Sequence, residues 1–164
     1  MIDLAAILIS QYLASLEMLK QTIDACPESI WNAASDRNKF WQVAYHALYF
    51  VHEYLADAPH TFTPWVKHRE VYDFDESRAF EPYDKETILE YLAFCQGHIL
   101  ERVPRLKLEE LEGHGNRTLT TLELQIYSIR HLMQHTGELM ERLGTRTNAQ
   151  IDWVGRQYSW TKDQ

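Results

Sequence analysis

The sequence predicts an all-α protein that folds as a four-helix bundle. Four segments place apolar side chains three and four residues apart, which is the spacing of an amphipathic helix. Helix-ending or helix-starting residues bound each of these segments. No segment shows the alternation and turn chemistry that are typical of a sheet. Because four such helices fill most of the 164 residues, we expect one domain, residues 1–164, with a single core.

The first two helices are expected over residues 4–23 and between Asp36 and Pro59. Pro27 follows the first helix, because proline cannot continue a helical hydrogen-bond ladder. The first apolar stripe consists of Leu4, Leu8, Tyr12, Leu16 and Leu19. The second consists of Phe40, Ala44, Ala47, Leu48, Val51 and Leu55. Each stripe is wide enough to face a core.

The third and fourth helices carry their own start signals. Asp84 is a natural N-cap for a helix that ends at Pro104. Thr120 and Glu123 have the spacing of a capping box, and Gly144 is expected to follow the last helical residue, Leu143. We expect the fourth helix to bury an arc formed by Leu122, Ile126, Ile129, Leu132, Met133, Leu139, Met140 and Leu143.

The connection from Ala58 to Tyr83 is longer than a bundle needs between helices two and three. It is rich in aromatic residues: Phe62, Trp65, Tyr72, Phe74, Phe80 and Tyr83. A disordered linker would not carry so many, so we expect this segment to pack on the bundle. It would act as a cap on the core or as a wall over a binding site.

Composition narrows the classes of function. A formal net charge of -8 and the absence of a basic run argue against a nucleic-acid partner. Cys26 and Cys95 do not form a CxxC pair, and we expect two buried thiols in a reducing compartment. The N-terminal MIDLAAILIS lacks a basic region and is neither a signal peptide nor a membrane span. We therefore expect a cytoplasmic protein with no membrane partner.

Three histidines have the positions of metal ligands. His131 and His135 are four residues apart in the fourth helix, which places both imidazoles on one face. His46 lies at the edge of the apolar stripe of the second helix. The three could converge at the mouth of the bundle and leave an open coordination position. The same pattern also fits three partly buried histidines that make ordinary hydrogen bonds. We expect the other five histidines to be solvated. His60 and His68 belong to the long connection, and either could turn toward the metal if that connection folds over the site.

The chain resembles the DinB-like (DinB/YfiT-like) family of small four-helix proteins, which is unrelated to the DNA polymerase that shares the name. The resemblance covers nearly the whole chain. It rests on a Trp-containing polar segment after the first helix, IWNAASDRNKFW, on one histidine in FWQVAYHALYF, and on the late motif IRHLMQHTGEL. It implies a divalent metal ion held by His46, His131 and His135.

General chemistry indicates which metal ions three imidazoles would bind and which groups would hydrogen-bond to those imidazoles. Imidazole ligands accept zinc or nickel, which we expect first, and also iron or manganese. A ligating imidazole usually donates its other N–H to an oxygen, and Glu53 and Glu138 are the candidate partners, together with Tyr49 and Tyr127. A simple cleft or surface position is the alternative for each of them.

The resemblance implies a metalloenzyme that uses a low-molecular-weight thiol, such as bacillithiol, mycothiol or glutathione, in S-transferase-like chemistry. Two alternatives stay open at this stage. One is a metal-dependent hydrolase with Glu53 or Glu138 as general base. The other is a stress-associated metal-binding module without turnover. The expected partners are a small-molecule substrate and a second copy in a homodimer, since proteins similar to this one often pair.

Overall fold

The computed structural model describes residues 2–57, 59–74, 80–114 and 117–158. The described chain is mostly helical, as the sequence predicts. Its four long helices are α1 (Leu4–Ala25), α3 (Phe40–Glu53), α4 (Lys85–Arg102) and α5 (Thr121–Thr147). The short helical elements are α2 (Glu28–Trp31), η1 (Pro59–Thr61) and η2 (Val103–Arg105).

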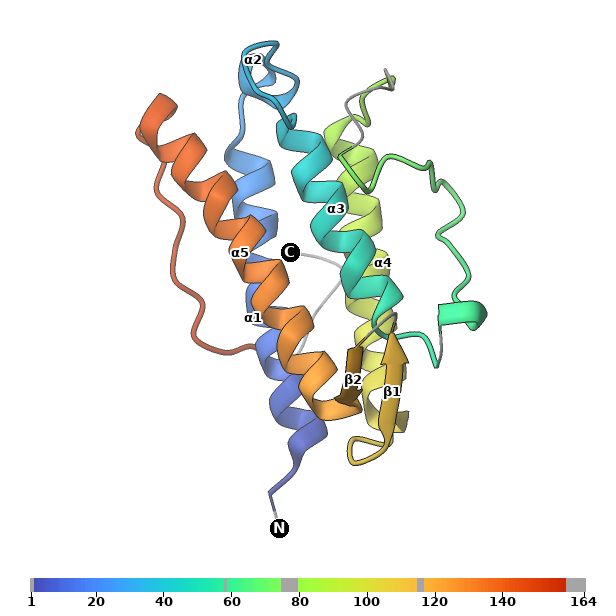
Figure 1. Cartoon of the computed structure of the whole chain (residues 1–164). Coiled ribbons are helices and arrows are strands. Elements are labelled where there is room, and N and C mark those ends of the chain that lie inside the picture. Colours follow the sequence, from blue (N-terminus) through green and yellow to red (C-terminus); the bar gives the residue numbers. More distant parts are fainter. Residues whose placement is uncertain (1, 58, 75–79, 115–116, 159–164) are drawn as a thin grey trace.

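The long helices lie side by side around a common core (Figure 1). α5 packs against α1 and α3, and α4 packs against the same two helices from the other side. α1 and α5 run in one direction, while α3 and α4 run in the opposite one. The core contains fully buried side chains from each long helix, such as Tyr12, Trp41, Tyr91 and Leu132. This packing places the middle of α3 directly beside the middle of α5.

The predicted helix starts are confirmed at two caps. The Asp84 side chain accepts a hydrogen bond from the backbone N–H of Thr87 at 2.8 Å. Thr120 and Glu123 form a complete capping box at the start of α5. Both caps satisfy backbone N–H groups that a helix cannot satisfy internally.

The capping box gives a stability prediction. We expect Thr120→Ala to lower the free energy of unfolding by about 1 kcal/mol, because the N–H of Glu123 loses its acceptor. Thr145→Ala, at an exposed position late in the same helix, should leave the free energy unchanged or slightly raised. Urea unfolding of both variants measures the difference, and equal values would show that the cap contributes nothing.

Two predictions about α5 were wrong. The helix passes Gly144 and ends at Thr147, because Asn148 adopts the left-handed conformation (φ 58°) that terminates it. The buried face is also rotated from the predicted arc, since Ile126 is 55% exposed whereas Gln125 is fully buried. Burial of Gln125 is compensated by hydrogen bonds, because its Oε1 accepts from Tyr12 Oη at 2.7 Å.

A two-stranded hairpin precedes α5, although the sequence reading expected no sheet. β1 (Leu111–His114) pairs antiparallel with β2 (Arg117–Thr120), with Leu111 opposite Thr120. The dipeptide between the strands is Gly-Asn, a known hairpin signal. The strands are only four residues long, so they are too short for a clear alternating pattern.

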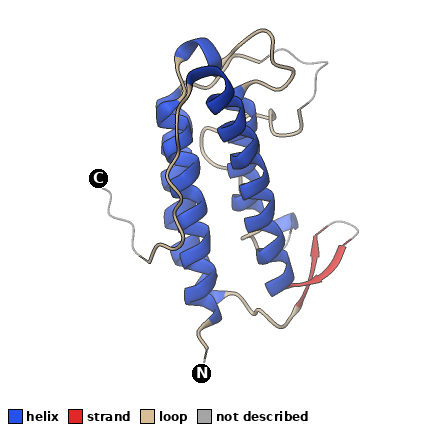
Figure 2. Cartoon of the chain, turned by 90° about the vertical axis from the view of Figure 1, so that its left-hand side faces the viewer, coloured by secondary structure: helices blue, strands red, loops and turns tan. Residues whose placement is uncertain are grey.

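After α5 the chain turns back along α1 (Figure 2). There the N–H of Asp152 donates to Gln21 Oε1 at 3.0 Å.

The long connection packs on the helices as expected. Trp65 is 8% exposed and stacks on Tyr91 of α4, with ring centroids 4.6 Å apart. Tyr83 stacks on Tyr45 of α3 at 5.0 Å. Residues 75–79 of this connection lie outside the described part of the chain. Its described residues pass along the side of the molecule formed by α3 and α4 (Figure 1). Tyr72 and Phe74 of this connection contact the His46 ring, so the connection covers His46.

Candidate metal centre

The structure brings His46 of α3 together with His131 and His135 of α5. The Nε2 atom of His131 lies 3.2 Å from Nε2 of His46 and 3.2 Å from Nε2 of His135. One ligand atom from each residue lies within 4.8 Å of those of the other two. His135 is 8% exposed, and His46 and His131 are partly buried. The predicted convergence of the three imidazoles is therefore present.

Hydrogen bonds orient two of the three rings. His46 Nδ1 donates to the backbone carbonyl of Tyr72, which can only accept. His135 Nδ1 lies 3.3 Å from the carboxylate of Glu138. An imidazole binds a metal ion in its neutral form, so a ring whose Nδ1 carries the hydrogen offers the lone pair of its Nε2. Burial, the largest effect on His46, lowers its pKa to about 4, so this imidazole is neutral at neutral pH.

This geometry fits a metal ion better than it fits a set of hydrogen bonds. His131 Nε2 can donate at most one hydrogen, yet it faces the lone pairs of both His46 and His135. Nitrogen ligands of one tetrahedral zinc ion, at about 2.0–2.1 Å from the metal, lie about 3.3–3.4 Å apart. The two separations from His131 Nε2, 3.2 Å each, match that value closely, and the ligand atoms of His46 and His135 lie within 4.8 Å of each other. The donor set is thus suited to a divalent cation.

The predicted partner Glu138 is in place, and Glu53 is not. Glu138 contacts His135 and accepts from Arg142 Nη2 at 2.7 Å. Arg142 in turn donates to Asp36 and to the carbonyl of Asn38, at 3.3 and 2.8 Å. Glu53 was the predicted acceptor for the second nitrogen of His46, and the structure has the Tyr72 carbonyl in that role. A backbone acceptor from a distant loop leaves no signal in the sequence, which is why the sequence reading missed it.

The contact with His135 predicts a role for Glu138. We expect Glu138→Ala to weaken zinc binding by about 10- to 100-fold, because the imidazole loses the acceptor that fixes its tautomer. Glu141→Ala removes an exposed carboxylate of the same helix and should leave the affinity unchanged. Competition with a chromophoric chelator measures both affinities. A Glu138→Ala protein with the parent affinity would remove Glu138 from the site.

Among the histidines whose side chains the structure describes, no other joins this group. His52 was expected to be solvated, but it is 4% exposed, and its Nδ1 lies 3.1 Å from Tyr91 Oη. Its ring also contacts that of His98, with centroids 4.9 Å apart. His68 is hydrogen-bonded to Tyr45 Oη at 2.7 Å. The helical stripes were too coarse to place His52, because it faces α4 instead of solvent.

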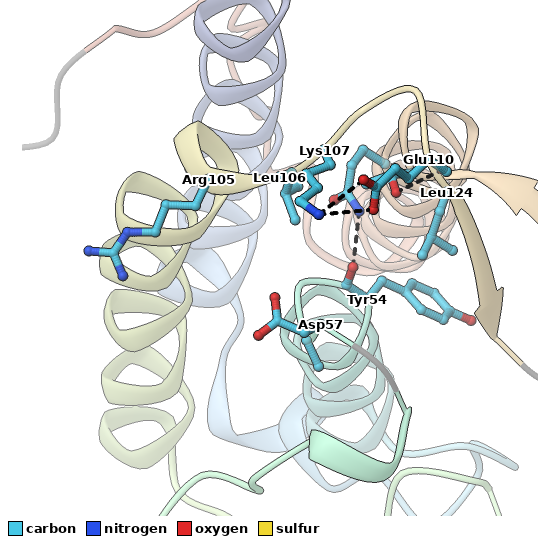
Figure 3. Close-up of a pocket in the computed structure, with 10 residues that line it drawn as sticks. Tyr54, Asp57, Arg105, Leu106, Lys107, Glu110 and Leu124 are labelled. Carbon is cyan, nitrogen blue, oxygen red and sulfur yellow. Dashed lines mark hydrogen bonds and ion pairs between the residues drawn. The ribbon is translucent and has the colours of Figure 1, made fainter.

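A separate cavity of about 280 Å³ lies where α3 ends and α5 begins (Figure 3). Leu124 and the fully buried Gln125 line it, and Lys107 and Glu110 form an ion pair of 3.0 Å beside it. The described residues around it include no histidine and no cysteine. Gln125 already donates to the Tyr54 carbonyl at 3.0 Å (Figure 3). This cavity therefore offers no second set of metal ligands.

Two further predictions concern the cysteines and the possibility of a membrane span. Cys26 and Cys95 are both buried and unpaired, as expected. Within the described residues, we find no helix with the length and apolar character that crossing a membrane requires.

Comparison with known proteins gives one match, to a family model. The model of the DinB superfamily matches residues 11–139, a range that contains all three histidines. No curated protein and no solved structure matches the chain. The match covers most of the 164 residues and confirms the resemblance noted in the sequence. The chain belongs to the DinB superfamily.

Proposed function

We propose that this protein is a divalent-metal-dependent enzyme whose site activates a low-molecular-weight thiol for transfer to an electrophile. The observation that supports it is the convergence of three imidazole Nε2 atoms, His131 Nε2 being 3.2 Å from each of the other two. His46, His131 and His135 are the proposed ligands. Three protein ligands leave a coordination position for a substrate, as in catalytic zinc sites.

The donor set also guides the choice of metal. Neutral imidazoles favour zinc or nickel, and iron and manganese are the next candidates. The bound cation would supply Lewis acidity, which lowers the pKa of a coordinated thiol and yields a nucleophile near neutral pH. The residues of the chain bind and orient: Tyr72 and Glu138 hold His46 and His135 through their Nδ1 atoms.

Glu138 acts as a positioning residue in this proposal. Its carboxylate is held between His135 and Arg142, so both of its oxygens already have partners. Glu53 is a different case, because burial raises the pKa of its carboxyl group. The acceptor for His46 is the Tyr72 carbonyl and not Glu53, so we assign Glu53 no catalytic role.

The test is a thiol-transfer assay on the zinc-, nickel- and manganese-loaded protein. Uncharged electrophiles are offered together with glutathione, bacillithiol or mycothiol as separate thiols. We expect product formation to require both the metal and a thiol, and to vanish in His131→Ala. Hydrolysis without any thiol would support the hydrolase alternative. Metal binding without turnover on any substrate would support the non-catalytic alternative.

We also propose that the four long helices form a DinB-type four-helix bundle in a single domain of residues 1–164. The homodimer and the cytoplasmic location stay predictions. Exposed apolar side chains for a dimer interface occur on α1, where Leu4 and Ile7 are 41% and 48% exposed, and on α5 at Ile126. Light scattering of the purified protein at several concentrations tests the dimer.

A further inference from the structure

Two phenylalanine rings flank the three histidines. Phe74 stacks on His46, with centroids 4.3 Å apart and planes 20° from parallel, and lies 6.1 Å from the ring of His135. Phe50 makes edge contacts with His46 at 4.8 Å and with His131 at 5.2 Å. Each phenylalanine therefore spans two of the three imidazoles. These distances lie within the range of favourable aromatic pairs.

The backbone of Phe74 indicates that its ring is held in place at a cost. Its φ of 54° is in the left-handed region, which a bulky residue rarely adopts because it is strained there. Two residues earlier, Tyr72 is fixed by its carbonyl contact with His46 and by stacking on Tyr49 at 4.1 Å. Strained conformations of this kind persist where the surrounding contacts determine them, and they cluster at functional sites.

The charges around the site select the kind of group that such rings would contact. Aromatic faces also attract cations, but a divalent ion with three neutral imidazoles carries a net positive charge and would repel one. Arg142, which reaches the site through Glu138, is already bound to Asp36 and to the Asn38 carbonyl. Aromatic rings make favourable stacked and edge contacts with other flat, uncharged groups. A flat, uncharged group is therefore the kind of substituent that Phe74 and Phe50 match.

We propose that this site takes substrates that carry a flat, uncharged, apolar group next to the metal-binding atom, such as a benzyl or allyl group. Phe74 is the residue that determines this specificity, since a substituent on an atom held beside His46 and His135 lies within reach of its ring. The inference rests on the proposed function, because it requires a metal ion at the three histidines.

The experiment measures thiol binding to the cobalt-loaded protein by the change in its visible absorption. Benzyl mercaptan and mercaptoethanol are the two probes, because they are alkyl thiols of similar acidity that differ in the aromatic ring. We expect the parent to prefer benzyl mercaptan. Phe74→Ala should reduce the ratio of the two dissociation constants by about two- to tenfold, the range of one aromatic pair.

Phe94→Ala is the matched control. Phe94 is a partly exposed phenylalanine of α4 whose ring contacts are with Tyr91, His52 and His98. Its replacement should leave the ratio unchanged. Phe74→Leu is a second variant that keeps apolar volume, and it serves if Phe74→Ala does not fold. It should bind cobalt with the parent spectrum and show a reduced ratio.

The outcomes separate the two proposals. A parent that binds no cobalt contradicts the metal site and, with it, the proposed function. A parent that binds cobalt and both thiols, with the same ratio in Phe74→Ala, Phe74→Leu and the parent, overturns the inference about Phe74 and leaves the metal site standing. A ratio that falls equally in Phe94→Ala also overturns it, because the effect would then not come from the site.

Discussion

Replacing His131 by alanine is expected to lower the affinity for zinc by more than about 100-fold, the upper end of what the loss of an outer-shell partner costs. His131 occupies the central place in the group, with its Nε2 3.2 Å from both of the other Nε2 atoms. The remaining two imidazoles come from different helices, α3 and α5. Without His131, the protein loses the two-point binding of the metal by neighbouring imidazoles of α5.

Elemental analysis of protein purified without a metal-affinity step checks this expectation. The parent should contain about one metal ion per chain, and His131→Ala and the double variant His46→Ala, His131→Ala should contain almost none. His98→Ala is the matched control, because its ring stacks on Phe94 and lies outside the group. Zinc should also raise the melting temperature of the parent and of His98→Ala, by mass action on the folded state. Equal metal content in all four proteins would show that the three histidines do not bind the metal and only stabilise the fold.

The helices could be predicted because their signals are local. The caps at Asp84 and Thr120 depend on residues within three positions of each other, and the structure shows both. The end of α5 could not be predicted in this way. Gly144 is the usual signal for a helix end, but α5 continues to Thr147 and is capped by Asn148. Asparagine, like glycine, can adopt the left-handed conformation that ends a helix. Where two residues can both end a helix, tertiary packing decides.

The spacing of the three histidines allowed a cluster but left ordinary hydrogen bonds open as the alternative, and the family resemblance favoured the cluster that the structure shows. The surroundings of the cluster could not be predicted. The spacing of His131 and His135 fixes them on one face of a helix, and the position of His46 points to the same side. Tyr72 and Phe74 come from a loop whose path depends on long-range packing, such as the stacking of Trp65 on α4. The aromatic density of that loop indicated a wall, but no local rule identified the ring that stacks on His46.

The buried face of α5 shows the limit of a hydrophobic pattern. Gln125 is fully buried because Tyr12 and the Tyr54 carbonyl satisfy its amide, whereas the apolar Ile126 is exposed. A polar residue can replace an apolar one in the core when its hydrogen bonds are made inside the protein. A prediction based on hydrophobicity alone then assigns the wrong residues to the buried face of the helix.

Asp36→Asn is expected to lower the free energy of unfolding by about 1–3 kcal/mol at neutral pH, because it weakens the hydrogen bonds that a buried carboxylate accepts from two partly exposed arginines. Asp36 is 8% exposed and pairs with Arg142 at 3.3 Å and with Arg146 Nη1 at 3.0 Å. The pair joins the segment before α3 to the last turns of α5. Asp24→Asn is the control, since its ion pair with Lys20 is exposed and should contribute less than about 0.5 kcal/mol.

The pH dependence distinguishes the ion pair from general packing. The hydrogen bond from Arg146 holds the pKa of Asp36 below its usual value of 3.8. The folded state therefore binds the proton less tightly than the unfolded state does. The stabilisation is complete above pH 3.8 and is lost as the pH falls through the folded-state pKa. Urea unfolding at neutral and acidic pH should thus show parent and Asp36→Asn converging in acid. A constant difference at every pH would mean that the carboxylate charge contributes nothing.

Asp36→Asn should also affect the metal site. Because Arg142, which contacts Asp36, also holds Glu138 against His135, Asp36→Asn should bind zinc more weakly than Asp24→Asn does.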